Sequence, residues 1–202
     1  MKVGLFGGTF DPIHVAHLIL AEWVREGMAL DRVLFVPAAV PPHKRQRALS
    51  SAWQRLAMVQ LATADWPLFS VSDLEIRRGG VSYTVDTVRE VRELFGLARN
   101  ELFLIIGSDS LQEITTWRDP EEIFAACQVV VVTRPGFDPA LAPTHFAAKA
   151  ILFAAPLLEV SSSQIRERIK AGKSIRYLVP SAVERYIREH GLYREGPSGH
   201  WS

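Results

Sequence analysis

The sequence contains a single cysteine, Cys127, and it lacks any long apolar run. One cysteine excludes an internal disulfide, which is typical of proteins from a reducing compartment. Cys127 precedes a run of valines, so we expect a buried, inert thiol rather than a nucleophile. No apolar run approaches the ~20 residues of a membrane-spanning helix, and the N-terminus carries no basic segment with a cleavage site. We therefore expect a cytoplasmic protein that does not associate with a membrane.

The chain also lacks an excess of either charge. Its 23 Lys and Arg residues face 22 Asp and Glu residues, which leaves a net charge of +1 over 202 residues. This balance argues against bulk binding of nucleic acid, which requires a basic surface. Repeats, low-complexity segments and clear linkers are absent as well. We expect one domain over residues 1–193 and a flexible tail over residues 194–202.

The N-terminal stretch predicts a strand, a glycine turn and a helix. Residues 2–6 are short and apolar, as in a buried strand. Gly7 and Gly8 have no Cβ atom, so a phosphate can approach their backbone closely. Apolar residues then recur at helical spacing over residues 18–26. The start of such a helix offers unpaired N–H groups and the positive end of a dipole, so we expect an anion to bind at this turn.

Two histidines, His14 and His17, stand where this helix would begin. Because they are three residues apart, they would lie on one face of the helix and point towards the same anion. A zinc site is one alternative, but no third ligand has the spacing that such sites usually show. Capping or packing is the other. The segment contains neither GxxxxGK(S/T) nor GxGxxG, so it would be a different kind of phosphate site.

A second candidate anion site lies further along the chain. Three consecutive serines, Ser161, Ser162 and Ser163, open a predicted helix that contains Arg166. Their hydroxyls and the N–H groups of a helix start can bind an anion. One serine would suffice for ordinary capping, so the residues alone leave both interpretations open.

Both segments resemble signatures of the nucleotidyltransferase superfamily. Residues 8–17 are similar to (S/T)FDPxHxGH, with Ala16 where the family has glycine. Residues 161–166 are similar to ISSTxIR, with Ser163 in place of threonine. The resemblance implies transfer of a nucleotidyl group from a nucleoside triphosphate to a phosphate acceptor, and it implies that Arg166 holds the triphosphate.

Further candidates follow the carboxyl ends of other predicted strands, where ligands bind in open α/β sheets. Lys44 lies in a basic loop after the strand at 31–37, which suits a polyphosphate, although most charge runs are simply solvated. Gly107 and Asp109 follow the apolar strand at 102–106. Asp109 can accept a hydrogen bond from a ribose hydroxyl, or it can cap the next helix.

One more cation, Arg134, follows a predicted strand at 129–133. Its planar fork suits the phosphate of an acceptor. The residues do not assign roles to Arg45 and Arg47. Residues 137–149 are rich in loop and weakly helical, and their role also stays open.

Four more segments resemble the bacterial nicotinate mononucleotide adenylyltransferases, namely residues 41–44, 82–87 and 106–109 and Trp117. The resemblance runs nearly end to end. It implies that the helix start at 82–87 lies beside the acceptor and that Trp117 lies over its pyridine ring, although packing alone would also explain a tryptophan there. The residues expected to bind the acceptor are Lys44, Ser82, Tyr83, Thr84, Trp117 and Arg134. Those expected to bind ATP are Gly7, Gly8, Thr9, Phe10, His14, His17, Gly107, Asp109, Ser161, Ser162, Ser163 and Arg166.

The implied reaction joins ATP and nicotinate mononucleotide to give deamido-NAD and pyrophosphate. Its nucleophile is a phosphate oxygen that is already largely ionised, so charge stabilisation is required rather than a general base. We expect His14, His17, Lys44 and Arg166 to supply it, with Mg²⁺ bound mainly through substrate phosphates and no protein metal ligand. Another phosphate-monoester acceptor, such as phosphopantetheine, and a non-catalytic nucleotide-binding regulator are the alternatives. A homo-oligomer is compatible with the sequence.

Predicted strands and helices alternate along the chain. This pattern favours one α/β domain in three layers, with a doubly wound, Rossmann-like parallel sheet. The resemblance implies the nucleotidyltransferase superfamily fold. We expect the three layers to bring the two signatures to one cleft at the strand ends. Residues 73–76 are expected to be extended.

Overall fold

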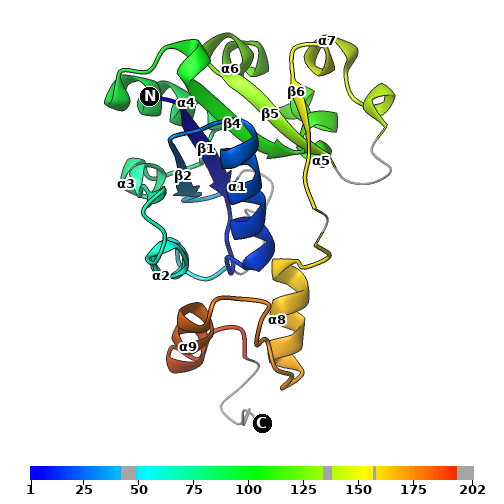
Figure 1. Cartoon of the computed structure of the whole chain (residues 1–202). Helices are drawn as coiled ribbons and strands as arrows, with labels where there is room; N and C mark the ends of the chain where they lie inside the picture. The colour runs from blue at the N-terminus through cyan, green and yellow to red at the C-terminus, as the bar shows by residue number, and fades with distance from the viewer. Residues whose placement is uncertain (42–48, 134–137, 157, 195–202) are drawn as a thin grey trace.

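The computed structural model describes residues 1–41, 49–133, 138–156 and 158–194. In these ranges six strands form one sheet in the order β3-β2-β1-β4-β5-β6, and every neighbouring pair is parallel (Figure 1). The chain order reverses between β1 and β4, as in a doubly wound sheet, so the predicted fold class is confirmed. The strands are β1 (Val3–Gly8), β2 (Arg32–Pro37), β3 (Phe69–Val71), β4 (Leu102–Gly107), β5 (Gln128–Thr133) and β6 (Ile151–Ala154).

Helices cover both faces of the sheet, which gives the three layers. One face packs against α1 (Val15–Gly27), α2 (Ala52–Thr63), α8 (Ser162–Lys170) and α9 (Ser181–Glu189). The opposite face packs against α3 (Leu74–Arg78), α4 (Thr84–Phe95), α5 (Ser108–Gln112), α6 (Pro120–Ala126) and α7 (Thr144–Ala147). Short 3-10 turns lie at Arg99–Glu101, Ile114–Thr116 and Pro139–Leu141.

Alternating side chains along the strands create a separate apolar cluster on each face. In β2, Leu34 and Val36 join the cluster under α4, whereas Val33 and Phe35 join the cluster under α1 and α8. The central strands are therefore apolar at nearly every position, as expected of parallel strands that are buried on both faces.

The prediction of an extended segment at 73–76 is wrong, because these residues enter α3. Leu74 and Glu75 are adjacent, and both are buried. Neighbouring side chains point to opposite faces of a strand, whereas they are only about 100° apart around a helix, so a helical turn in a corner of the core can bury both. An ion pair between Arg77 and Asp73 at 2.7 Å adds local support one turn apart.

Two other expectations have definite outcomes. Cys127 is fully buried, and burial raises the pKa of its thiol to about 12, which confirms an inert thiol. The loop-rich region at 137–149 contains one 3-10 turn and α7, whose Phe146 packs into the apolar cluster under α4.

None of the helices in the described ranges combines the length and the apolar character that crossing a bilayer requires. Figure 1 shows α8 and α9 at the end of the molecule towards which β1 points. The carboxyl end of β1, the adjacent carboxyl end of β4 and the start of α8 consequently frame one site.

Candidate active site

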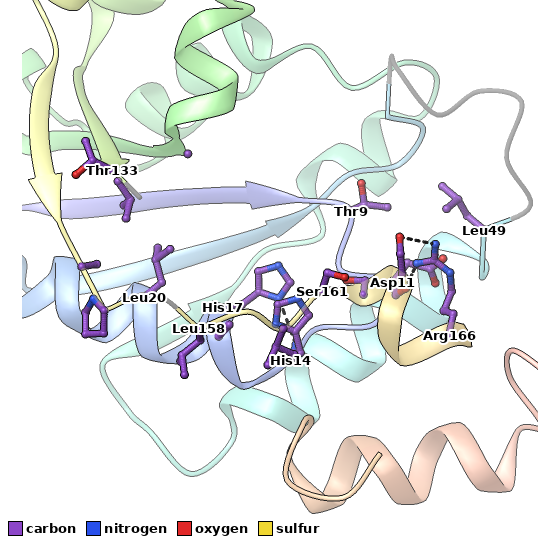
Figure 2. Close-up of a pocket in the computed structure, with 18 residues that line it drawn as sticks. Thr9, Asp11, His14, His17, Leu20, Leu49, Thr133, Leu158, Ser161 and Arg166 are labelled. Carbon is purple, nitrogen blue, oxygen red and sulfur yellow. Dashed lines mark hydrogen bonds between the residues drawn. The ribbon is translucent and has the colours of Figure 1, made fainter. Parts of the chain in front are cut away.

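A cavity of about 360 Å³ opens at the carboxyl ends of β1, β4 and β5 (Figure 2). The two segments that resemble signatures, residues 8–17 and residues 161–166, both contribute to this cavity. The Ser162 hydroxyl bonds to the Pro12 carbonyl, although the two residues are 150 positions apart. The predicted residues that line the cavity are Thr9, His14, His17, Gly107, Ser161, Ser162, Ser163 and Arg166.

The loop between β1 and α1 owes its shape to Phe10. This residue has a positive φ of 49°, and its side chain is buried instead of lining the cavity. A Cβ atom on Gly8 would stand 2.8 Å from the Phe10 ring, so glycine is needed there for packing. The predicted turn at Gly7 and Gly8 is wrong, because both glycines belong to β1 and pair with β2, and the chain turns only after Gly8. A Cβ atom on Gly7 would meet nothing within 4 Å, so the approach to its backbone is open.

His14 and His17 stack upon each other, with ring centroids 3.6 Å apart and planes 23° apart. The His14 backbone N–H donates to Nδ1 of His17 at 3.2 Å. Because Nδ1 of His17 accepts this bond, the neutral ring carries its proton on Nε2, and Nε2 is then its donor. His17 therefore offers a hydrogen-bond donor whose orientation is fixed by the start of α1.

His14 is the N-cap residue of α1, and its side chain is only 5% exposed. Burial lowers its pKa to about 4, so the ring is neutral near pH 7. Within the described ranges, His14 Nδ1 and Asp11 Oδ2 are the buried side-chain polar atoms without a hydrogen-bond partner. Unsatisfied buried polar atoms are rare, and both belong to residues that line the cavity.

Helix α8 docks onto the same loop through its first turn. Ser161 caps the helix by accepting a bond from the Gln164 N–H at 3.2 Å. The Ser162 hydroxyl donates to the Pro12 carbonyl at 2.9 Å. One serine therefore caps, as the alternative interpretation allowed, while another joins the two segments.

Arg166 spans the junction between α8 and the loop. Its Nη1 donates to the Asp11 carbonyl at 2.8 Å, and its Nη2 donates to the Ser163 hydroxyl at 3.2 Å. A guanidinium has five N–H donors, so these two bonds orient the group and leave further donors for an anion in the cavity. Figure 2 shows Arg166 beside Asp11 at the edge of the cavity, away from the histidine pair.

Sequence reasoning gave no role to Arg55 and Tyr193, which fix the loop from behind. The buried guanidinium of Arg55 donates to the carbonyls of Thr9 at 2.8 Å, Ala39 at 2.9 Å and Ser50 at 3.2 Å. The Tyr193 hydroxyl donates to Oδ1 of Asp11 at 2.7 Å. Burial is the main cause that raises the pKa of Tyr193, so this hydroxyl keeps its proton.

Among the residues expected to bind the acceptor, the four that the structure describes, Ser82, Tyr83, Thr84 and Trp117, do not line this cavity. Tyr83 is the N-cap of α4 and Thr84 is its first helical residue. Trp117 is half-buried against the apolar cluster on that face. Arg118 lies over the Tyr83 ring at 4.8 Å. These residues form a separate group on the face of the sheet opposite α1.

Two further predicted residues have informative positions. The Ser82 hydroxyl accepts a bond from the Ala39 N–H at 2.9 Å, so it is used within the protein. Asp109 lies in the first turn of α5, whose N-cap is Gly107, so Asp109 is not the cap. Lys44 and Arg134, which were expected to bind the acceptor, lie outside the described residues. So do Arg45 and Arg47, to which the sequence assigned no role.

The described ranges contain no group of three or more His, Cys, Asp and Glu side chains that could hold a metal ion. Asp11 is the acidic residue that lines the cavity. A divalent cation at this site would thus need most of its ligands from a bound substrate and from water.

Comparison with known proteins gives a consistent result. A family model described as "Cytidylyltransferase-like" matches residues 5–168. A Thermus thermophilus protein named "Probable nicotinate-nucleotide adenylyltransferase" is 48% identical over 194 residues, which cover 96% of this chain and 100% of that protein. A Desulfitobacterium hafniense protein of the same name is 44% identical over 200 residues, with 96% of each chain covered.

Solved structures share the fold. The Plasmodium falciparum nicotinic acid mononucleotide adenylyltransferase complexed with NaAD has a TM-score of 0.77 at 19% identity and covers 95% of this chain and 97% of its own. The same protein complexed with APC has a TM-score of 0.75, also at 19% identity, and covers 95% of this chain and 96% of its own.

Proposed function

The chain belongs to the nicotinate-nucleotide adenylyltransferase family within the cytidylyltransferase-like proteins, and from this premise we propose that it transfers the adenylyl group of ATP to nicotinate mononucleotide. The products are deamido-NAD and pyrophosphate, and the reaction belongs to NAD biosynthesis. One observation of the structure carries the proposal. Arg166 on α8 is hydrogen-bonded to the Asp11 carbonyl of the loop after β1, so both predicted phosphate-binding segments face one cavity.

The cavity suits the triphosphate of ATP. The His17 Nε2 donor and the Arg166 guanidinium approach it from two elements, α1 and α8. Donors that are held in place before the reaction stabilise charge on a phosphate without reorganising. His14, being neutral, acts there as a hydrogen-bonding ring and not as a cation.

No general base is required in this reaction. The second ionisation of a monoester phosphate has a pKa near ~6, so the attacking oxygen is already largely deprotonated at neutral pH. The chain has to hold two anions close together and stabilise the leaving pyrophosphate. The described residues of the cavity supply hydrogen-bond donors and one cation for this task, Arg166.

Mg²⁺ belongs to the proposal as an ion carried by ATP. When bound, it neutralises part of the phosphate charge. Among the described lining residues Asp11 is the one acid, and it has one buried oxygen without a partner, which fits a cation that is held mainly by phosphates and water.

The acceptor is proposed to bind at the start of α4, beside Tyr83 and Thr84. A helix start offers N–H donors and positive potential, and both favour the carboxylate of nicotinate over an amide. Trp117 is half-exposed and offers a flat aromatic surface for the pyridine ring. The NaAD-bound Plasmodium protein, which shares the fold, supports a pyridine nucleotide as a ligand of this architecture.

A panel of acceptors tests the proposal. Pyrophosphate release from ATP is measured with nicotinate mononucleotide, nicotinamide mononucleotide and phosphopantetheine, each with and without Mg²⁺. We expect the highest kcat/KM for nicotinate mononucleotide and little release without Mg²⁺. A higher value for phosphopantetheine would contradict the acceptor, and ATP binding without release from any acceptor would indicate a regulator.

A further inference from the structure

A single residue, Ala39, connects the two halves of the proposed site through its backbone. Its N–H donates to the Ser82 hydroxyl at 2.9 Å, and its carbonyl accepts from Nη2 of Arg55 at 2.9 Å. Arg55 is 1% exposed and Ser82 is 9% exposed. Ala39 itself is half-buried, and its two bonds to buried side chains restrict its position from both sides.

Arg55 carries the connection to the loop that faces ATP. Its Nη1 donates to the Thr9 carbonyl at 2.8 Å, and Thr9 lines the cavity. No carboxylate among the described residues forms an ion pair with this guanidinium, whose hydrogen bonds all go to backbone carbonyls. Burying a cation costs free energy unless its N–H donors are satisfied. Three backbone carbonyls satisfy the donors of Arg55, and Arg55 in turn joins the three backbone segments that carry them.

Glu75 carries the connection in the other direction. The Thr87 hydroxyl donates to its carboxyl group. Nη2 of Arg78 also donates to the Thr87 hydroxyl at 2.9 Å. Thr87 belongs to the first turn of α4, whose N-cap Tyr83 directly follows Ser82, so the buried Glu75 holds the turn that Ser82 leads into.

We propose that Arg55 and Glu75 are positioning residues that set the distance between the ATP loop and the start of α4, with Ala39 between them. Hydrogen bonds connect Thr9 through Arg55 and Ala39 to Ser82, the backbone leads from Ser82 into α4, and Glu75 holds the first turn of α4 through Thr87. This inference rests on the proposed function, because it assigns ATP to one end and the acceptor to the other. Neither residue touches a substrate; both act through backbone segments that do.

The physical reason is the geometry of the transfer. The attacking phosphate oxygen and the α-phosphate have to approach within roughly 3–3.5 Å, and a displacement of about 1 Å can cost about 10²-fold in rate. The segment at Ala39 also pairs directly with the segment before α4, through a bridge between Val40 and Val81 and a bond from the Ser82 N–H to the Val40 carbonyl at 3.0 Å. The bonds of Ala39 to Arg55 and Ser82 extend this connection to the ATP loop.

Steady-state kinetics of Glu75→Gln, Glu75→Ala and Arg55→Met provide the first test. We expect kcat to fall by about 10- to 10²-fold in Glu75→Ala and Arg55→Met, while the Kd of ATP measured alone changes much less. Glu75→Gln keeps an acceptor oxygen for the Thr87 hydroxyl and should retain most of the rate. Thr63→Val is the matched control, because it removes a buried hydroxyl of α2 that bonds only within its helix.

The double variant Arg55→Met/Glu75→Ala tests whether the two residues act as one unit. If they do, its loss of kcat is smaller than the product of the two single losses. Any of three results would overturn the proposal. The two single losses of kcat could multiply in the double variant, both single variants could match the control in kcat, or Glu75→Gln could be as slow as Glu75→Ala.

Amide hydrogen exchange gives a readout that does not depend on activity. Glu75→Ala and the milder Ser82→Ala should speed exchange over residues 37–41 and, through Arg55, over residues 8–12. Thr63→Val should leave both segments protected. If the wild-type protein transfers the adenylyl group to no acceptor, the proposed function fails. The exchange pattern still shows whether residues 37–41 and residues 8–12 are coupled. Unchanged exchange at residues 8–12 in well-folded variants would contradict it.

Discussion

Acid should destabilise this protein through His14, and replacing His14 should remove that sensitivity. Burial lowers the pKa of His14 from 6.5 to about 4 in the folded state. Between these two values the unfolded chain binds a proton at this residue and the folded chain does not. Stability is therefore lost as the pH falls from about 6.5 towards 4.

The size of this effect follows from the pKa difference. A shift of one pKa unit corresponds to ~1.4 kcal/mol, so the full contribution is about 3 kcal/mol, and about 2 kcal/mol of it is lost by pH 5. Above pH 7 the residue contributes no pH dependence. Glu75 acts in the opposite sense, because burial raises its pKa and the folded state then holds its proton more tightly.

Urea unfolding at a series of pH values from 7.5 to 4.5 measures this effect, with wild type compared to His14→Gln and His14→Asn. Subtracting the two pH profiles cancels Glu75 and the surface carboxylates, which are present in all three proteins. We expect the free energy of unfolding of wild type to approach, and then fall below, that of the variants as the pH drops. Parallel profiles across the whole range would refute the buried, neutral His14.

Three further predictions concern activity. His17→Ala should lower kcat by about 10²–10³-fold with little change in the Kd of ATP, because its Nε2 donor meets charge that grows in the transition state; a normal kcat with weaker ATP binding would contradict this. Arg166→Ala should weaken ATP binding, and Arg166→Lys should not fully restore it, since a point charge cannot replace a fork held by Asp11 and Ser163. Trp117→Ala should weaken nicotinate and nicotinamide mononucleotide alike, so the ratio of their kcat/KM values stays nearly constant; a collapsed ratio would show that the indole reads the carboxylate.

The sheet could be predicted from the sequence because its signal is local. Parallel strands that are buried on both faces are apolar at nearly every position, so β4 and β5 stand out within their own residues. The predicted end of β1 lies two residues too early, because glycine usually signals a turn, whereas Gly7 and Gly8 pair with β2. The prediction of an extended segment at residues 73–76 was wrong, because two adjacent buried side chains give no clear period in so short a segment.

The support behind the cavity could not be predicted, because its partners are distant in sequence. Arg55 lies 46 positions from Thr9, and nothing nearby distinguishes it from an arginine on a solvated helix. Tyr193 lies 182 positions from Asp11, directly before the predicted flexible tail at residues 194–202. The stacking of His14 on His17 also depends on the loop, since spacing alone places them on one face without setting the ring contact.

Ser82 illustrates a different limit. The family resemblance places its segment beside the acceptor, and the structure shows that its hydroxyl accepts a hydrogen bond from the Ala39 N–H. Sequence patterns identify which segment belongs to a site more readily than which atoms face the ligand. Here the exposed start of α4 is left to Tyr83 and Thr84, and Ser82 supports it from inside.

Labelled ATP tests the central claim most directly. The chain is incubated with nicotinate mononucleotide, Mg²⁺ and ATP labelled at either the α- or the γ-phosphate, and the products are separated. We predict that the α-label appears in deamido-NAD and the γ-label in pyrophosphate, in equal amounts. An α-label that stays in AMP or ATP, or a γ-label transferred to the acceptor, would contradict adenylyl transfer to nicotinate mononucleotide.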